Sequence, residues 1–138
     1  MSEEPLSEVF RHEMSVPVEV IDENGHVNNV AYLQWMNDAA LSHFRALGGE
    51  VLLDELSATW VARSHHIEYL RPLYEGDELV VRPWIATLER VKSVRRYSFE
   101  SGEKVIARGE TVWVLVDRTS GRPQRIPAEM ETALRRTG

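Results

Sequence analysis

The feature that most constrains the fold is an amphipathic segment, residues 30–47, with the apolar spacing of one long helix. Apolar side chains recur there at intervals of three or four residues, which places them on one face of a helix. The members of this face are Val30, Leu33, Met36, Ala40, Phe44 and Leu47. Asn28 or Asn29 can cap the start of the helix, and the pair Gly48-Gly49 is a stop signal after it. The predicted helix is about 27 Å long and should be well buried.

Most of the remaining chain has the composition of β-strands separated by short turns. A short strand near a sheet edge is predicted at 14–21, and longer strands are predicted at 58–71, 77–89, 91–101 and 104–117. Consecutive strands joined by tight turns form an antiparallel sheet, and one long helix must cover one of its faces. A short helix is expected at about 127–136, with Pro127 in its first turn. The fold class is therefore α+β, with a curved sheet wrapped around the central helix.

Length and composition narrow the classes of function. The chain has 138 residues, which we interpret as one domain, 1–138, with its core at about 14–117. It has no cysteine, and this excludes disulfides, thiolate metal sites and a cysteine nucleophile. A net charge of -6 argues against nucleic-acid binding. Residues 1–5 do not resemble a signal peptide, and no apolar run is long enough to span a membrane, so we expect a cytoplasmic protein.

Positive charge is concentrated in two places. Residues 90–96 contain four cations and no anion, and Arg118, Arg122 and Arg125 form a second cluster. One interpretation is a solvated strand edge and turn. The other is a landing site for the phosphorylated tail of a substrate.

The loop before the helix carries a recognisable motif, Asp22-x-x-Gly25 followed by Tyr32 and Trp35-Met36. This pattern resembles the signature of the 4-hydroxybenzoyl-CoA thioesterase-like group, whose fold is the hot-dog fold. Residues 22–32 are also similar to the loop of plant acyl-carrier-protein thioesterases. The segments 67–72 and 76–79 resemble the strand and turn that follow the helix in these families. The resemblance covers about 14–117.

One departure from the plant enzymes limits what the resemblance implies. Those enzymes carry a further acidic residue and a cysteine at the end of this strand, just after the positions of Glu68-Tyr69. Here the corresponding positions are Pro72 and Leu73. A mechanism that rests on that pair cannot be carried over, so the assignment depends on the Asp22 loop.

Asp22 is the candidate catalytic group. The resemblance implies that it acts as a general base on a water molecule or attacks the thioester carbonyl itself. The alternative is that Asp22 only starts an Asx-turn before the helix. The backbone N–H of Asn28 or Asn29 at the helix start could stabilise the developing oxyanion, an effect of roughly 3 kcal/mol per donor. Gly25 would let the backbone turn closely at the substrate.

The other site candidates are less specific. Asn24 could orient water or the carbonyl, and His26 could act as a base, a donor or a positioning group, or be structural. Tyr32 is either core or part of an acyl tunnel. Adjacent strand residues point to opposite faces, so His65 and His66 cannot chelate a metal together. We expect no metal site and no cofactor.

The resemblance also implies an assembly and a substrate. Hot-dog subunits pair into homodimers with a continuous sheet, often doubled into tetramers, and their active sites lie at the dimer interface. The CoA tail commonly meets surface cations, for which the candidates here are Arg90, Lys92, Arg95 and Arg125. The leading hypothesis is hydrolysis of an acyl-CoA. The alternatives are an acyl-carrier-protein thioesterase, docked on the 90–96 segment, and a non-catalytic acyl-thioester binding module.

Overall fold

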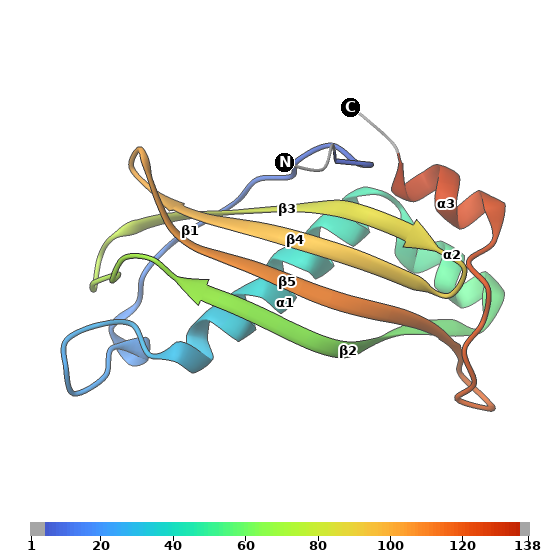
Figure 1. Cartoon of the computed structure of the whole chain (residues 1–138), viewed down its shortest axis with the longest axis horizontal. Coiled ribbons are helices and arrows are strands. Elements are labelled where there is room, and N and C mark those ends of the chain that lie inside the picture. Colours follow the sequence, from blue (N-terminus) through green and yellow to red (C-terminus); the bar gives the residue numbers. More distant parts are fainter. Residues whose placement is uncertain (1–4, 136–138) are drawn as a thin grey trace.

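A curved antiparallel sheet of five strands wraps around one long helix in this computed structural model, which describes residues 5–135 (Figure 1). The strands lie in the order β1-β3-β4-β5-β2. Their bounds are β1 His12–Ser15, β2 Ala58–Tyr69, β3 Glu78–Glu89, β4 Lys92–Ser101 and β5 Lys104–Asp117. The helices are α1 Asn29–Ala46, α2 Gly49–Leu56 and α3 Ala128–Leu134, with a 3-10 turn, η1, at Val18–Val20.

Helix α1 packs its apolar face against the inner face of the sheet. Met36 and Ala39 are fully buried and belong to one core cluster with Tyr97, Phe99 and other inward-facing strand residues. The long buried helix predicted from the apolar spacing is confirmed, one residue earlier than expected at each end. Val30 was assigned to the buried face wrongly. Its side chain is 76% exposed, because this position in the first turn of the helix points away from the sheet.

A second helix follows where the sequence indicated only an end. Gly48 adopts a left-handed conformation with φ 78°, which reverses the chain, and α2 begins at the next residue. The stop signal is therefore confirmed, but no element was predicted between it and β2. Three partly buried leucines of α2 pack on a second core cluster, beside Phe44 and α3.

The ends of the chain differ in detail from expectation. The predicted strand 14–21 is β1 followed by η1, because Pro17 has no N–H to continue the ladder. Pro127 caps α3 rather than starting its first turn. Residues 1–4, interpreted above as part of a terminus that is not a signal peptide, and residue 136 of the predicted helix lie outside the described residues. Within 5–135, no helix is both long enough and apolar enough to cross a membrane.

Candidate active site

The loop between η1 and α1 is a small closed turn held by backbone hydrogen bonds. Ile21 and Val27 form an isolated antiparallel bridge, and Asp22 N donates to His26 O at 2.8 Å. Gly25 N donates back to Asp22 O at 3.0 Å. Gly25 has φ 79°, a left-handed conformation that favours glycine. The motif glycine is therefore required by the turn itself.

The carboxylate of Asp22 is exposed to solvent, and only one of its two oxygen atoms is hydrogen-bonded to the loop. Its Oδ1 atom accepts from Asn24 N at 2.9 Å and from His26 N at 3.3 Å. The Asx-turn considered as an alternative is therefore present, and it orients the carboxylate. The Oδ2 atom has no partner among residues 5–135. One oxygen thus holds the loop, and the other is available to a water molecule or a substrate.

Asn28 caps the helix through its side chain. Its backbone N–H donates to Val20 O at 2.8 Å, its Oδ1 accepts from Ala31 N at 3.0 Å, and its Nδ2 donates to Val20 O at 3.0 Å. The predicted cap is confirmed. The backbone N–H of Asn28 is engaged by Val20, and a substrate-binding role for this residue stays a prediction. The first backbone N–H groups of the helix, those of Asn29 and Val30, have no acceptor within the helix.

A pocket of about 280 Å³ lies where the start of α1 meets the end of β2. Its lining residues are His26, Val27, Asn29, Tyr32, Tyr69, Leu70, Arg71 and Pro72. The structure thus brings three of the predicted residues, His26, Asn29 and Tyr32, to one cavity. The rings of Tyr32 and Tyr69 meet edge to face at 5.0 Å. Burial, and then the proximity of Tyr69, raise the pKa of Tyr32 to about 12, so this phenol stays protonated at neutral pH.

The remaining polar candidates of the loop are exposed. The ring of His26 contacts Tyr74 edge to face at 5.5 Å. The side chain of Asn24 makes no hydrogen bond to any residue in the described range, although its backbone N–H holds Asp22. Neither role predicted from the resemblance is tested by this geometry, and both stay predictions.

The predicted CoA-binding cations lie away from the Asp22 loop in this chain. Arg90 is in the turn between β3 and β4, and its carbonyl accepts from Ile126 N at 2.7 Å, which brings Arg125 close to it in space. This turn, with Lys92 and Arg125 nearby, lies at the α2 end of the molecule, and the Asp22 loop lies at the other (Figure 1).

Arg95 was grouped with these surface cations wrongly. Its side chain is only 6% exposed, because every second residue of β4, from 93 to 99, points inward toward the helix. Its neighbour Arg96 faces outward and pairs with Glu110 at 3.1 Å. The segment 90–96 is therefore not one basic surface. The signal was present in the sequence, since Arg95 is two residues from Tyr97 and four from Phe99 in a strand.

The histidine pair in β2 is divided between the two faces of the strand, as expected. His65 Nδ1 lies 3.0 Å from Thr111 Oγ1, inside the curve of the sheet. On the other face, Glu68 lies 4.0 Å from Arg108. Among the described residues, no group of three His, Asp or Glu side chains is placed to hold a metal ion.

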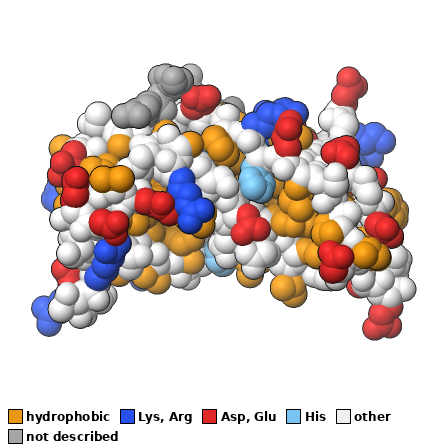
Figure 2. Space-filling model, turned by 180° about the vertical axis from the view of Figure 1, so that it is seen from behind, with side chains coloured by type: hydrophobic (Ala, Val, Ile, Leu, Met, Phe, Trp, Pro, Cys, Tyr) orange, Lys and Arg blue, Asp and Glu red, His pale blue; other side chains and the backbone are white. Residues whose placement is uncertain are grey.

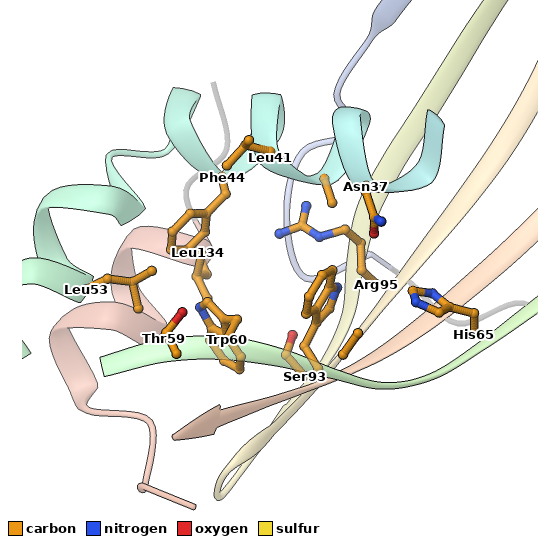
Figure 3. Close-up of a pocket in the computed structure, with 13 residues that line it drawn as sticks. Asn37, Leu41, Phe44, Leu53, Thr59, Trp60, His65, Ser93, Arg95 and Leu134 are labelled. Carbon is orange, nitrogen blue, oxygen red and sulfur yellow. The ribbon is translucent and has the colours of Figure 1, made fainter. Parts of the chain in front are cut away.

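Sequence reasoning missed the larger cavity, about 430 Å³, between the second half of α1, β2 and the inner face of the sheet (Figure 3). Its lining residues are Asn37, Ala40, Leu41, Phe44, Leu53, Thr59, Trp60, Ala62, His65, Ser93, Arg95, Trp113 and Leu134. They come from α1, α2, β2, β4, β5 and α3, so no contiguous motif could have revealed this cavity.

A family model described as the thioesterase-like superfamily matches residues 16–134. The chain belongs to this superfamily. The structure is similar to a probable thioesterase from Escherichia coli, with a TM-score of 0.84, 18% identity, and coverage of 91% of this chain and 96% of that one. It is also similar to a 1,4-dihydroxy-2-naphthoyl-CoA thioesterase from Synechocystis, with a TM-score of 0.81, 20% identity, and coverage of 91% and 95%.

A third similar structure is a hypothetical protein from Staphylococcus aureus in complex with CoA. It has a TM-score of 0.82 and 19% identity, and the match covers 96% of this chain and 85% of that chain. At these identities the likeness shows the fold. The α+β hot-dog fold expected from the sequence is confirmed, and so is the thioesterase family.

Proposed function

We propose that this protein hydrolyses an acyl-CoA thioester with Asp22 as the general base or the nucleophile. The proposal rests on the Asp22 carboxylate, which the loop orients through one oxygen while the other has no partner among the described residues. Seven residues later the first N–H groups of α1 have no acceptor within the helix, and Asn29 there lines the pocket. A thioester carbonyl bound beside Asn29 would have its oxygen near these donors and the positive end of the helix dipole. Asp22 would then face the reacting carbon from the neighbouring loop.

Asp22 can promote hydrolysis of the thioester by either of two routes. In the base route, Asp22 takes a proton from water as the water oxygen bonds to the carbonyl carbon, the C–S bond breaks, and the proton passes to the CoA thiolate. In the nucleophile route, Asp22 bonds to the carbon, the thiolate leaves, and water then cleaves the anhydride. Thiolate is a good leaving group, so neither route needs a strong acid beside the sulfur. We propose positioning roles for Asn24 and His26, since both backbone N–H groups hold the carboxylate.

A CoA substrate is supported by the structural neighbours. One is a complex with CoA, and another is named for a CoA thioester. Arg90, Lys92 and Arg125 are the proposed contacts of the phosphorylated tail. Because they lie at the far end of the same subunit, they would serve the active site of a partner subunit.

We propose that the partner is a second copy paired through β2. This strand is at the edge of the sheet, and residues 61–66 are exposed on both faces. The strand itself exposes two apolar side chains, those of Val61 and Tyr69. The face that carries α1 likewise shows apolar side chains between charged ones (Figure 2). Light scattering should give at least a dimer. A wild-type monomer at micromolar concentration would contradict this assembly.

The function is tested by thiol release over a panel of acyl-CoA esters, with Asp22→Asn assayed beside the wild type. Hydrolysis by the wild type and its loss in the variant are expected. Matched acyl-CoA and acyl-carrier-protein substrates separate the two enzymatic alternatives. The carrier alternative has less support from the structure, because Arg95 is buried and Arg96 is paired. If the wild type binds acyl-CoA but releases no thiol, the protein is a binding module.

A further inference from the structure

The larger cavity contains a buried cation without a counter-ion. The guanidinium of Arg95 points into the cavity, toward the side where Phe44 lies (Figure 3). Within residues 5–135 it makes one side-chain hydrogen bond, from Nη1 to Nδ1 of His43. No carboxylate of the described residues pairs with it. Burial lowers the pKa of Arg95 to about 10, so it still carries its charge at neutral pH. An unpaired buried charge is costly, and proteins usually supply a partner.

The histidine beside Arg95 cannot neutralise that charge. His43 is 1% exposed and stacks on Phe10 with ring centroids 5.2 Å apart. Burial, and then the neighbouring Arg95, lower the pKa of His43 to about 3. His43 is therefore neutral, accepts from Arg95 through Nδ1, and holds the guanidinium in place. It positions the cation and leaves the other guanidinium N–H groups to another acceptor.

The indole of Trp113 also lines this cavity, but its buried Nε1 interacts with the side chain of Tyr97 on the neighbouring strand. It is therefore not left to a ligand as the guanidinium is. Ser93, the other polar residue nearby on β4, uses its hydroxyl to donate to Thr87 O at 3.0 Å. The guanidinium of Arg95 is therefore the group in this cavity that requires an acceptor, and a carboxylate is an acceptor only. The remaining wall is largely apolar, and a single cation matches one carboxylate better than a phosphate dianion.

The cavity is placed to receive the far end of a substrate. Both this cavity and the pocket at the start of the helix are lined by α1 and β2, and they lie at successive positions along the two elements. From Asn29 to Asn37 the helix rises about 12 Å, and from Tyr69 to His65 the strand spans about 13 Å. An extended acyl group whose thioester is at the helix start would need to cover this distance along α1 to reach Arg95.

We propose that this cavity binds a carboxylate at the distal end of the acyl group, held by Arg95, so that the preferred substrates are ω-carboxyacyl thioesters. This specificity rests on the proposed thioesterase activity. The volume of about 430 Å³ is within the range of small-molecule sites.

The experiment compares matched substrates. Adipoyl-, suberoyl- and sebacoyl-CoA are each paired with the monocarboxylic ester of the same length: hexanoyl-, octanoyl- and decanoyl-CoA. The wild type should show a kcat/KM at least about ten-fold higher for the carboxylated member of one pair, as expected when a charge-assisted contact is gained. Arg95→Met should abolish that preference, and Arg95→Lys should restore part of it. Arg96→Gln, on the outer face of the same strand, is the matched control and should keep the wild-type preference.

A second measurement does not depend on catalysis. Titration calorimetry with octanoate and with octanamide presents the carboxylate and its neutral analogue without a thioester. The wild type should bind octanoate more tightly, and Arg95→Met should bind the two equally. If no thioester is cleaved yet octanoate binding depends on Arg95, the activity fails and the site stands. If the wild type prefers the uncharged ligands, or if the preference persists in Arg95→Met, the proposal is overturned.

Discussion

The loop before α1 and the cavity near the other end of this helix each contain a charged side chain, but they hold it in different ways. Asp22 lies in an exposed loop, and the groups that hold its carboxylate lie within four residues of it in the chain. Arg95 lies in a buried cavity, and its one hydrogen-bond partner in the described residues, His43, is 52 residues away. In the first region, local structure positions the carboxylate that we propose as catalytic. In the second, tertiary structure buries a cation that lacks a counter-ion among the described residues. The proposed chemistry thus depends on contacts close in the chain, and the proposed specificity depends on contacts between distant segments.

The largest effect should come from Asp22. Asp22→Asn removes the proposed general base or nucleophile, and we expect kcat to fall by about 10²- to 10⁴-fold. The fold should persist, because the amide oxygen of Asn can still accept from the backbone N–H groups of the loop. Thiol release measures the loss, and circular dichroism checks the fold. Wild-type turnover in this variant would remove Asp22 from the mechanism.

At the other end of the helix, Gly49 should be the most sensitive glycine to substitution. A Cβ at this position would overlap the ring of Phe44, which lines the cavity. Gly49→Ala should therefore lower the free energy of unfolding by about 1–3 kcal/mol, measured by urea denaturation. Val51→Ala, at an exposed site on the same helix, is the control and should change stability little. Equal stability of the two variants would mean that the Phe44 ring moves without cost.

The buried His43 should make the protein acid-sensitive. Its folded pKa of about 3 is below its unfolded value, so its contribution to stability is complete above about pH 6.5 and is lost as the pH falls toward 3. Within that window the free energy of unfolding falls by about 1.4 kcal/mol for each pH unit, because unfolding takes up one proton. His43→Gln keeps an acceptor for Arg95 but does not titrate. Urea unfolding at pH 7, 6, 5 and 4 should show a shallower loss in the variant. Parallel profiles would exclude His43 as the source.

The smallest effect should be the loss of the helix cap. Asn28→Ala removes the side-chain bonds to Ala31 and Val20, and we expect a loss of about 1 kcal/mol in unfolding free energy. Asn29→Ala is the matched control, since its side chain has no hydrogen bond to a described residue, and it should be at least as stable as the wild type. If both variants lose the same stability, the cap contributes through something other than these bonds.

Much of the fold was predictable because its signals are local. The apolar spacing of 30–47 defined α1 to within a residue, and the last long strand, 104–117, matches β5. The misses have physical causes. Helix α2 was not predicted because it is only eight residues long and begins directly after Gly48. Its apolar spacing is too short to be recognised next to a glycine pair that signals the end of a helix. Pro17 divides what looked like one strand.

The sequence alone determined the Asp22 turn, the glycine it needs and the capped helix start, because these groups bond to residues a few positions away. Tertiary structure decided which polar groups remain free. The N–H of Asn28 is taken by Val20, while Arg95 is turned inward by the register of β4 and enclosed by α1 and β2. A side chain's burial depends on which surfaces close over it, and those surfaces come from distant parts of the chain.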